Sequence, residues 1–311
     1  MFIDIHVHTS NWSDLPWGPG MQCPCTAEQL LAMYDAVGIA KAVLLPLVTP
    51  ECNILTQSNE EILQVAGRYP GRFIPFCNLD PRLSVNSPTF DFGFVIEHYK
   101  GKGCKGIGEV TANLSFDDPR VTNLLDHAER HDLPVLFHVA TRDGGMYGLV
   151  DDLGLPRFEK QLQSHPGLIF LAHSTSFWSH ISADVSAENW GSYPKGPVVR
   201  GGRVPELLRR YRNLHGDLSA GSGYNAISRD PGFGYEFLDE FQDQLCFGTD
   251  VCQPKNRNDV LVWLKAFLED GLANGKMTKT AFEKITWQNA ARVLKLDVGA
   301  SAQRSVQVSR R

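Results

Sequence analysis

Two histidines near the start of the chain, His6 and His8, stand two residues apart in the apolar, β-branched run MFIDIHVHTS. In a β-strand, residues i and i+2 point to the same face, so both imidazoles should leave one face at the end of a buried strand. Neutral imidazole is a good ligand for zinc and iron. The spacing therefore predicts half of a metal site, although such a pair alone also fits two hydrogen-bonded core histidines.

Four later apolar runs also end in a residue that can ligate a metal: CKGIGE ends at Glu109, PVLFH at His138, LIFLAH at His173 and QLCFGTD at Asp250. One polar residue of this kind can simply mark the end of a core strand. Five strands that all end this way need another explanation, because histidine and carboxylate are costly at the edge of an apolar layer unless something compensates them. A shared divalent ion would compensate them together. Histidines with carboxylates favour zinc, with manganese and iron as alternatives.

These residues belong to a chain that alternates strand-like and helical segments. Strand-like runs lie at 2–8, 41–47, 72–79, 104–110, 134–140, 168–173, 214–220 and 245–250. Helical patterns lie between several of them, at 26–38, 58–69, 118–132 and 258–271. Most strand-like runs are apolar on both faces, which is typical of a buried parallel sheet.

Eight strand–helix units predict an α/β fold, a distorted (β/α)8 TIM barrel with the metal site at the carboxyl ends of its strands. A doubly wound sheet is the main alternative. Only a closed ring, however, would bring His6 beside Asp250. The ligand pattern and the strand pattern therefore favour the same architecture.

Length and composition fit one enzyme-sized domain. The chain has 311 residues, of which 42% are hydrophobic and 21% charged, and α/β barrels of this length form single units. We expect one domain over 1–296 and a disordered, polar and basic tail over 297–311. Two long connections, 10–25 and 174–203, are expected to lie over the mouth of the barrel as lids.

Charge and hydropathy limit the partners. The net charge of −5 argues against nucleic acid as the main partner. No apolar run approaches the ~20 residues needed to span a bilayer, and no secretory leader is recognisable. We therefore expect a cytoplasmic protein with a small-molecule substrate and no membrane association, which could form homo-oligomers.

The seven cysteines are scattered and odd in number, which argues against a disulfide framework and for a reducing compartment. Cys23 and Cys25 form a C-x-C pair in a proline-bearing loop. We interpret them as loop thiols, with a second metal site as the alternative.

The pattern resembles the amidohydrolase superfamily, and more closely its family 2 branch of metal-dependent TIM-barrel enzymes. The resemblance covers roughly residues 1–296, and the closing WQNAARVLKL (287–296) is similar to the last helix of that branch. It is carried mainly by His6, His8, His138, His173 and Asp250. Glu109 stands where many binuclear members have a carboxylated lysine, and its segment KGIGEV resembles the IGE segment of TatD-like deoxyribonucleases.

The resemblance implies two arrangements of the metal. In the binuclear one, the first ion is held by His6, His8 and Asp250, the second by His138 and His173, and Glu109 bridges or caps them. In the mononuclear one, which is similar to the aminocarboxymuconate-semialdehyde decarboxylase type, His138 joins the first set and His173 orients the bound water. The sequence leaves both open.

The leading functional hypothesis is a hydrolase that uses metal-activated water on a small carboxylated ester, lactone or amide. Asp250 and His173 are the expected catalytic residues, with Asp250 taking the proton of the attacking water. Arg142, Asn225 and Arg229 follow the fifth and seventh strands and are the candidate substrate-binding residues, since an arginine can clamp a carboxylate with two parallel hydrogen bonds.

Three other functions remain as alternatives. A mononuclear, non-oxidative decarboxylase would use the same scaffold. A TatD-like nuclease is suggested by KGIGE but disfavoured by the acidic balance of the chain. The last alternative is a metal-binding scaffold without chemistry. Among neighbouring residues, Trp12, Trp17 and Trp178 are expected to wall the pocket, and Asp217 to satisfy backbone donors at the end of its strand.

Overall fold

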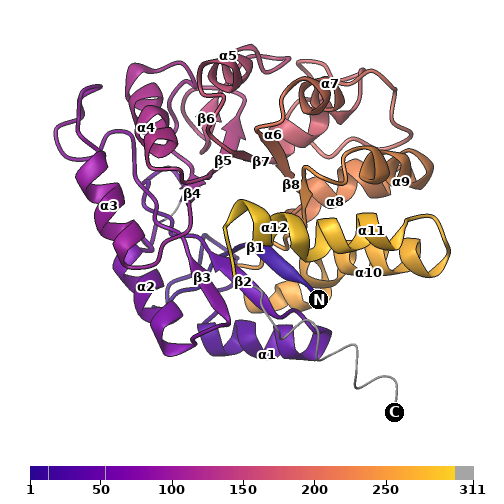
Figure 1. The fold of residues 1–311 in the computed structure, drawn as a ribbon, viewed down its shortest axis with the longest axis horizontal. Coiled ribbons are helices and arrows are strands. Elements are labelled where there is room, and N and C mark those ends of the chain that lie inside the picture. The colour runs from indigo at the N-terminus through magenta and orange to yellow at the C-terminus, as the bar shows by residue number, and fades with distance from the viewer. Residues whose placement is uncertain (13, 53, 298–311) are drawn as a thin grey trace.

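The computed structural model describes residues 1–12, 14–52 and 54–297, and it shows a ring of short parallel strands surrounded by helices (Figure 1). The strands are β1 (Ile3–Val7), β2 (Lys41–Leu44), β3 (Phe73–Pro75), β4 (Ile107–Val110), β5 (Val135–Ala140), β6 (Leu149–Val150), β7 (Phe170–His173), β8 (Leu214–Asp217) and β9 (Leu245–Cys246). Each of the eight predicted runs contains one of them. The additional strand is β6, a two-residue strand that pairs with the end of β5.

The strands form two parallel sheets that meet at both edges. One sheet has the order β1-β2-β3, and the other β4-β5-β7-β8-β9. A parallel bridge between Cys77 and Ile107 joins β3 to β4, and a bridge between Val7 and Val251 joins β1 to the segment after β9. At this second seam the amide of Asp250 donates to the carbonyl of His6 over 2.8 Å. The fold is the TIM barrel that the sequence predicts.

The α-helices are α1 (Ala27–Val37), α2 (Asn59–Arg68), α3 (Gly93–Gly101), α4 (Pro119–Arg130), α5 (Pro156–Ser164), α6 (Thr175–Trp178), α7 (Arg203–Arg210), α8 (Ala220–Ser228), α9 (Pro231–Glu240), α10 (Val260–Ala273), α11 (Lys279–Glu283) and α12 (Asn289–Val293). Shorter helical turns are η1 (Ser179–Ile181), η2 (Pro254–Asn258) and η3 (Lys284–Gln288). Four of these helices, α1, α2, α4 and α10, occupy the ranges that the sequence predicts.

Local capping explains where the first helices start. The side chains of Thr26 and Gln29 form a capping box at the start of α1, which satisfies backbone donors that a helix start leaves free. At α2, the Ser58 side chain caps the helix by accepting from the amide of Glu61, but the Glu61 side chain does not complete a capping box. Its carboxylate instead accepts hydrogen bonds from the Ser10 hydroxyl (3.0 Å) and the Asn11 amide (2.5 Å). Glu61 thereby ties down the loop that leaves β1.

A change of register in β1 lets four of its side chains face the inside of the ring. Ile3 and Ile5 belong to the inner apolar cluster, to which the last helix α12, drawn beside β1 in Figure 1, also contributes side chains. Asp4 points outwards, where its carboxylate accepts a hydrogen bond from the hydroxyl of Tyr34 on α1 over 2.5 Å. The pairing of β1 with β2 is irregular between Asp4 and Val7, and beyond this point the inward positions are His6 and His8.

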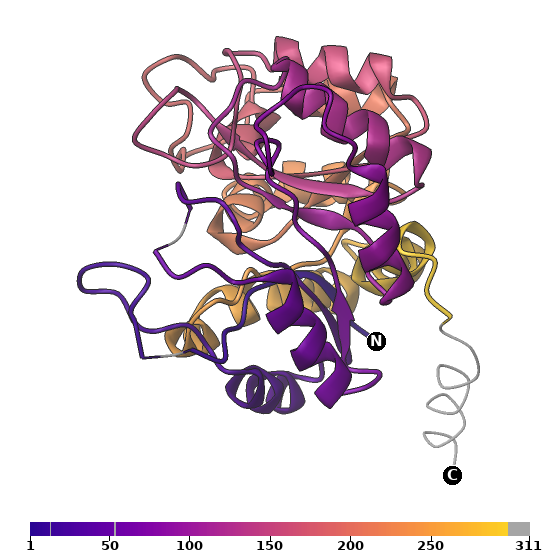
Figure 2. The same cartoon turned by 90° about the vertical axis from the view of Figure 1, so that its left-hand side faces the viewer.

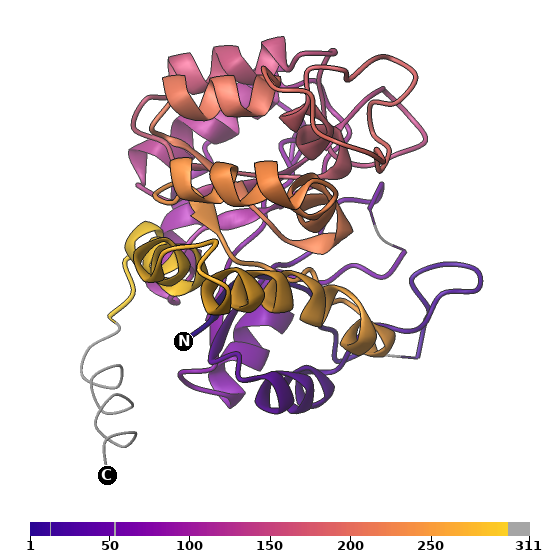
Figure 3. The same cartoon turned by 90° about the vertical axis from the view of Figure 1, so that its right-hand side faces the viewer.

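The loops that follow the strands gather at one end of the barrel, opposite the end at which the N-terminus lies (Figures 2 and 3). Catalytic residues of barrel enzymes come from this end. Within the described ranges, no helix is both long and apolar enough to cross a membrane. The tail predicted for 297–311 lies outside the described residues except for Asp297.

Candidate metal centre

His6, in β1, and His8, directly after it, meet at the carboxyl ends of the barrel strands, with their Nε2 atoms 3.1 Å apart. Each imidazole is fixed through its other nitrogen, Nδ1. The Nδ1 of His6 lies 2.7 Å from Oδ2 of Asp217, and the Nδ1 of His8 lies 3.0 Å from the carbonyl oxygen of Leu45. A carbonyl oxygen can only accept, so His8 Nδ1 carries the hydrogen, and His6 donates to the carboxylate in the same way. When both rings are neutral, both Nε2 atoms therefore present lone pairs to the same point.

Two carboxylates approach the same point from opposite sides of the ring. Oε2 of Glu109, on β4, lies 3.6 Å and 3.5 Å from the Nε2 atoms of His6 and His8. Oδ1 of Asp250, beyond β9, lies 3.5 Å and 3.6 Å from the same two atoms. The Glu109 side chain is buried, whereas that of Asp250 is 28% exposed. Two lone pairs and two carboxylates thus converge in a largely buried space.

This donor set fits a divalent ion. Atoms bound at 2.0–2.2 Å to a tetrahedral zinc ion stand ~3.3–3.6 Å apart, and imidazole nitrogen and carboxylate oxygen are among its usual ligands. The separations of 3.5–3.6 Å between the histidine nitrogens and the carboxylate oxygens match this spacing. His6, His8 and Asp250 form one group of converging ligand atoms, and His6, Glu109 and His173 form another.

The electrostatics point the same way. Burial alone would lower the pKa of His6, but the negative charges of Asp250 and Asp217 outweigh it and raise this pKa well above the usual value. Burial alone would raise the pKa of Glu109, but hydrogen bonds from His138 and His6 hold it well below the usual range. A site whose field favours a proton on His6 and a charge on Glu109 also favours a bound cation.

His138, at the middle of β5, stands behind Glu109. Its Nδ1 lies 3.0 Å from Oε1 of Glu109, and its ring packs on that of Tyr147 with centroids 4.4 Å apart. Burial lowers the pKa of His138, so its ring is neutral at pH 7. Donation from Nδ1 to Glu109 leaves Nε2 with a lone pair. His138 therefore orients Glu109, whose other carboxylate oxygen faces His6 and His8.

His173, at the end of β7, is oriented by residues of the following strand. Its Nδ1 lies 3.0 Å from the hydroxyl of Ser219 and 3.4 Å from Asp217 Oδ2. The Ser219 hydroxyl itself donates to Asp217 over 2.9 Å, so its oxygen is free to accept from His173. This fixes the proton of His173 on Nδ1 and leaves Nε2 for the centre.

Asp217 is the functional residue that the sequence analysis underestimated. It is fully buried at the end of β8, and its carboxylate touches both His6 and His173. Burial opposes its charge, but these two histidines hold its pKa well below the usual range. The signal was present, because LHGD ends in a carboxylate as CKGIGE and QLCFGTD do. Acidic partners of this kind fix the tautomer and orientation of ligand histidines.

A cavity of about 240 Å³ opens above the centre. Its lining includes the candidate ligands His8, Glu109, His138, His173 and Asp250. The remaining wall is formed by Trp17, Met21, Leu47, Cys52, Tyr147 and Cys252. Trp17 and Met21 come from the connection 10–25, which therefore does lie at the mouth. Burial raises the pKa values of Cys52 and Cys252, so both remain thiols at pH 7.

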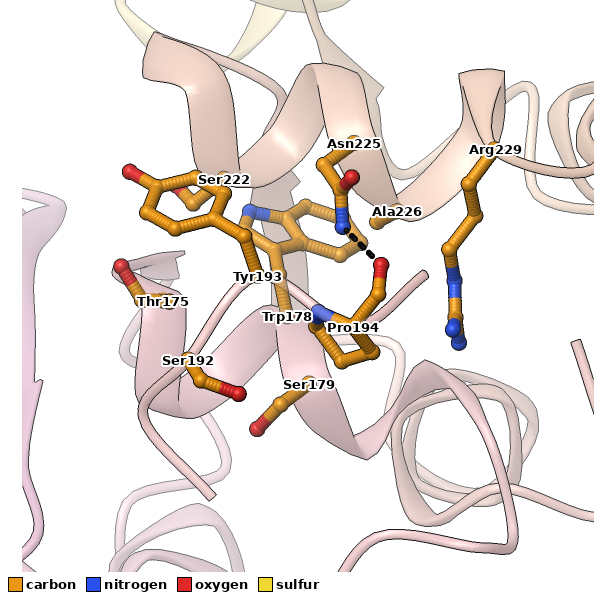
Figure 4. A pocket seen from close by; sticks show the side chains of 10 residues that line it. All are labelled: Thr175, Trp178, Ser179, Ser192, Tyr193, Pro194, Ser222, Asn225, Ala226 and Arg229. Carbon is orange, nitrogen blue, oxygen red and sulfur yellow. Dashed lines mark hydrogen bonds between the residues drawn. The ribbon is translucent and has the colours of Figure 1, made fainter. Parts of the chain in front are cut away.

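The structure does not bring the three predicted substrate-binding residues to this cavity. Arg142 is exposed in the loop after β5 and is not among the lining residues. Asn225 and Arg229 line a different cavity of about 10 Å³ beside α8, little larger than one water molecule (Figure 4). There the Asn225 amide donates to the carbonyl of Pro194 over 3.1 Å. The order of residues along a loop could not show which way these side chains turn.

The connection 174–203, which is predicted as a second lid and lies within the described residues, supplies no residue to the lining of the cavity above the centre, and its own packing explains why. The start of 174–203 folds into α6 and η1, and Trp178 is buried with its indole N–H donating to the carbonyl of Asp217 over 2.8 Å. Tyr193 and Pro194 of this connection lie over α8 at the small cavity (Figure 4). Trp12 is largely exposed. Of the three tryptophans, only Trp17 lines the cavity above the centre.

The seven cysteines are all free, with Cys25 buried and Cys23 half-buried. Burial raises the pKa of Cys25 to about 12. Within the described residues, neither belongs to a group of converging metal ligands.

Comparison with known proteins relates the last third of the described chain to a protein family. Residues 198–296, which include Asp250, match the family model described as Amidohydrolase. Among curated proteins, no sequence matches. Of the solved structures, an amidohydrolase from Burkholderia multivorans with bound zinc aligns with a TM-score of 0.64 at 15% identity, over 96% of this chain and 100% of the other.

Two further structures resemble the chain over nearly its full length. The 2,6-dihydroxybenzoate decarboxylase from Rhizobium has a TM-score of 0.58 at 16% identity, with 95% of this chain and 99% of the other covered. A probable 2-pyrone-4,6-dicarboxylic acid hydrolase from Acinetobacter baumannii, with citric acid bound, has a TM-score of 0.54 at 15% identity, with 95% and 99% covered. At these identities the likeness establishes the fold.

Proposed function

We propose that the chain is a member of the amidohydrolase superfamily, in its family 2 branch, and that it is a metal-dependent hydrolase of small esters, lactones or amides. Solved structures with this fold include a probable hydrolase and a decarboxylase, so the proposal concerns the reaction and its substrate. The single observation that carries it is the convergence of His6, His8, Glu109 and Asp250 beneath an open cavity.

Each residue has a task in this reaction. A divalent ion at this centre would lower the pKa of its water from ~15.7 to about 7 and polarise the carbonyl of the substrate. Asp250, the most exposed of the converging groups, accepts the proton of the attacking water and returns it to the leaving group. His173 is held by Ser219 with its Nε2 towards the centre, where it orients the water. Zinc is the expected ion, with manganese or iron as alternatives.

The cavity wall refines the substrate. In the described part of the chain, the lining contains no arginine or lysine. The cavity therefore offers a remote carboxylate no cationic partner, and the predicted arginine clamp does not form. We propose that the reacting carbonyl group, or a carboxylate next to it, binds at the ion itself. The body of the substrate would lie against Trp17, Met21 and Tyr147, which favours a compact, apolar or aromatic group.

Metal removal tests the proposal directly. Protein treated with a chelator and then dialysed is assayed on a panel of aryl esters, lactones and anilides, before and after addition of Zn²⁺ or Mn²⁺. Hydrolysis should disappear on removal and return on addition. Full hydrolysis by protein shown to be metal-free would contradict the proposal, as would metal-replete protein that hydrolyses none of the panel.

A non-oxidative decarboxylase is the second candidate, and one observation favours it. The two groups of converging ligand atoms share His6, and His138 turns its Nδ1 to Glu109, an arrangement that one ion can satisfy. The likeness of the fold to that of the Rhizobium decarboxylase is compatible with this second candidate. Metal-dependent release of carbon dioxide from a dihydroxybenzoate, with no hydrolysis of the panel, would favour it over the hydrolase. Two ions per chain would weigh against it.

A further inference from the structure

The carboxylate of Asp4 lies on the outer side of β1, behind the metal centre, and accepts four hydrogen bonds. Asp4 is fully buried. Its Oδ1 accepts from the amides of His6 and Thr249, each over 3.0 Å. Its Oδ2 accepts from the hydroxyls of Thr249 and Tyr34, each over 2.5 Å. Two carboxylate oxygens offer about four acceptor positions, so these donors use the full capacity of the side chain.

The donors come from both sides of the seam that closes the ring. His6, on β1, is a candidate ligand, and Thr249 directly precedes Asp250, the candidate ligand on the other side of the seam. These two segments are far apart in the sequence, yet a single side chain binds the backbone of both. Tyr34, on α1, covers the same carboxylate from outside and belongs to neither segment.

The pairing across this seam is irregular next to the ligands. The amide of Ile5 donates to the carbonyl of Phe247 over 3.1 Å. Three residues further along, the amide of His8 donates over 3.0 Å to the carbonyl of Val251, which is four residues further along the facing segment. The facing segment therefore carries one extra residue, as in a β-bulge. The amide of Thr249 lies inside this irregularity, and its acceptor is the buried carboxylate of β1.

Asp250 has a backbone conformation that the neighbouring bonds must hold. Its φ is +58°, in the left-handed region that residues other than glycine rarely adopt, although aspartate tolerates it. The amide of Asp250 donates to the carbonyl of His6 over 2.8 Å. On its other side, the amide of Val251 donates over 3.3 Å to the Thr249 hydroxyl, which itself donates to Asp4. The turn that carries Asp250 is therefore anchored, through Thr249, on Asp4.

We propose that Asp4 is a positioning residue of the metal centre, which holds His6 and Thr249 so that the ligand atoms of His6 and Asp250 keep a spacing suited to a shared ion. That spacing is the 3.5 Å between Nε2 of His6 and Oδ1 of Asp250. Asp4 is not among the lining residues of the cavity and acts through the backbone that it binds. The inference rests on the proposed function, in which both groups are ligands.

Metal affinity of Asp4→Asn tests this role, with Asp151→Asn as the matched control. Asparagine keeps the shape of the side chain but replaces one accepting oxygen with a donating NH₂ group, so it cannot accept all four hydrogen bonds. Asp151 is also buried, and its carboxylate accepts from the amides of Asp152, Arg157 and Phe158 over 2.8, 3.0 and 2.9 Å. Burial raises the pKa of both carboxyls to about 6, so measurements at pH 8 compare two ionised side chains.

Further variants separate the two hydroxyls that share Oδ2 of Asp4, and they keep the test decisive if Asp4→Asn does not fold. Thr249→Val keeps the shape of the side chain and removes the hydroxyl that joins Asp4 to the segment of Asp250. Thr249→Ser restores that hydroxyl. Tyr34→Phe removes a hydrogen bond of the same length to the same oxygen, but from α1, which carries none of the candidate ligands.

Each protein is stripped with a chelator and titrated with Co²⁺, because the absorption bands of the bound ion report the geometry of its ligands. Asp4→Asn and Thr249→Val should bind Co²⁺ about tenfold more weakly than wild type, with shifted absorption bands. Asp151→Asn, Tyr34→Phe and Thr249→Ser should keep the wild-type affinity and spectrum, even where their melting temperatures fall.

Wild-type affinity and spectrum in either Asp4→Asn or Thr249→Val would overturn the positioning role. An equal loss of affinity in Asp151→Asn or Tyr34→Phe would also overturn it, because general destabilisation would then explain the result. Wild-type protein that binds no Co²⁺ is a different outcome. It would contradict the metal centre of the proposed function itself, and the positioning role with it.

Discussion

Nδ1 of His6 lies 2.7 Å from Oδ2 of Asp217, and both side chains are fully buried. The carboxylate fixes the hydrogen of the imidazole on Nδ1 and aims the lone pair of Nε2 at the convergence point of the centre. The same carboxylate reaches His173, so one buried charge orients two histidines that come from either side of β8. Buried charges are retained when paired in this way.

Asp217→Asn should therefore weaken metal binding without removing a ligand. Loss of an oriented acidic partner typically costs 10–100-fold in metal affinity, and we expect a change of about this size in a competitive titration with a chromogenic chelator. Activity should recover in part at excess Zn²⁺. Ser219→Ala, which removes only the hydroxyl bonded to Asp217 and His173, should have a smaller effect. Unchanged affinity in Asp217→Asn would show that the carboxylate does not position the ligands.

Asp250→Asn should separate proton transfer from metal binding. The amide keeps an oxygen that can ligate but cannot accept the proton of the attacking water. General acid–base help is worth about 10²–10⁴-fold, so kcat should fall within this range while the metal content stays close to that of wild type. A variant that holds its metal and turns over at the wild-type rate would show that Asp250 is a ligand only.

Gly248→Ala should displace Asp217. A Cβ atom at residue 248 would lie 2.6 Å from Asp217 Oδ1 and 2.8 Å from Ser219 Cβ, closer than atoms can approach. We expect lower metal affinity and a lower melting temperature. The matched control is Gly67→Ala in α2, where a Cβ meets nothing within 4 Å and alanine should stabilise the helix by about 0.5–1 kcal/mol. Wild-type affinity in Gly248→Ala would contradict the close packing around Asp217.

The stability of the protein should fall at mildly acidic pH because of His180. Its Nδ1 donates to the carbonyl of Ser176 (2.8 Å), and its Nε2 accepts from the amide of Gly154 (2.9 Å). Burial lowers the pKa of His180 from 6.5 to about 4. The unfolded chain therefore binds this proton first as the pH falls, and the stabilisation present above pH 6.5 is lost progressively towards pH 4.

Because of the titration of His180, the free energy of unfolding should be about 2 kcal/mol lower at about pH 5 than at pH 7. Urea unfolding at both pH values should show wild type losing more stability than His180→Gln, which is destabilised at pH 7 but lacks this titration. Burial also lowers the pKa of His215, but His215 is present in both proteins, so its effect cancels from the comparison. Parallel losses in the two proteins would contradict the assignment to His180.

The ring and its ligand-bearing ends could be predicted because they follow from local rules. Strands buried on both faces read as continuous apolar runs, and polar residues at their carboxyl ends are conspicuous. His6 and His8 share a face because the strand repeats every two residues. The irregularity between Asp4 and Val7 could not be seen in the sequence, although it decides that Ile5 and His6 both face inwards.

The substrate-binding residues could not be predicted in the same way. The prediction for Arg142, Asn225 and Arg229 rests on their positions after strands, but the direction of a loop side chain depends on tertiary packing. Asn225 is held by Pro194, which lies 31 residues earlier in the chain, and no local pattern encodes that contact. Asp217 was visible as a strand-end carboxylate, but its partners His6 and His173 come from other strands.

The seam between β1 and Val251 has a consequence for how the protein matures in the cell. The ribosome completes His6 and His8 long before it adds Asp250, so an unfinished chain cannot present the full set of ligands. An ion bound by the complete set of ligands would therefore have to enter after synthesis of the last strand, when the two termini of the ring have met.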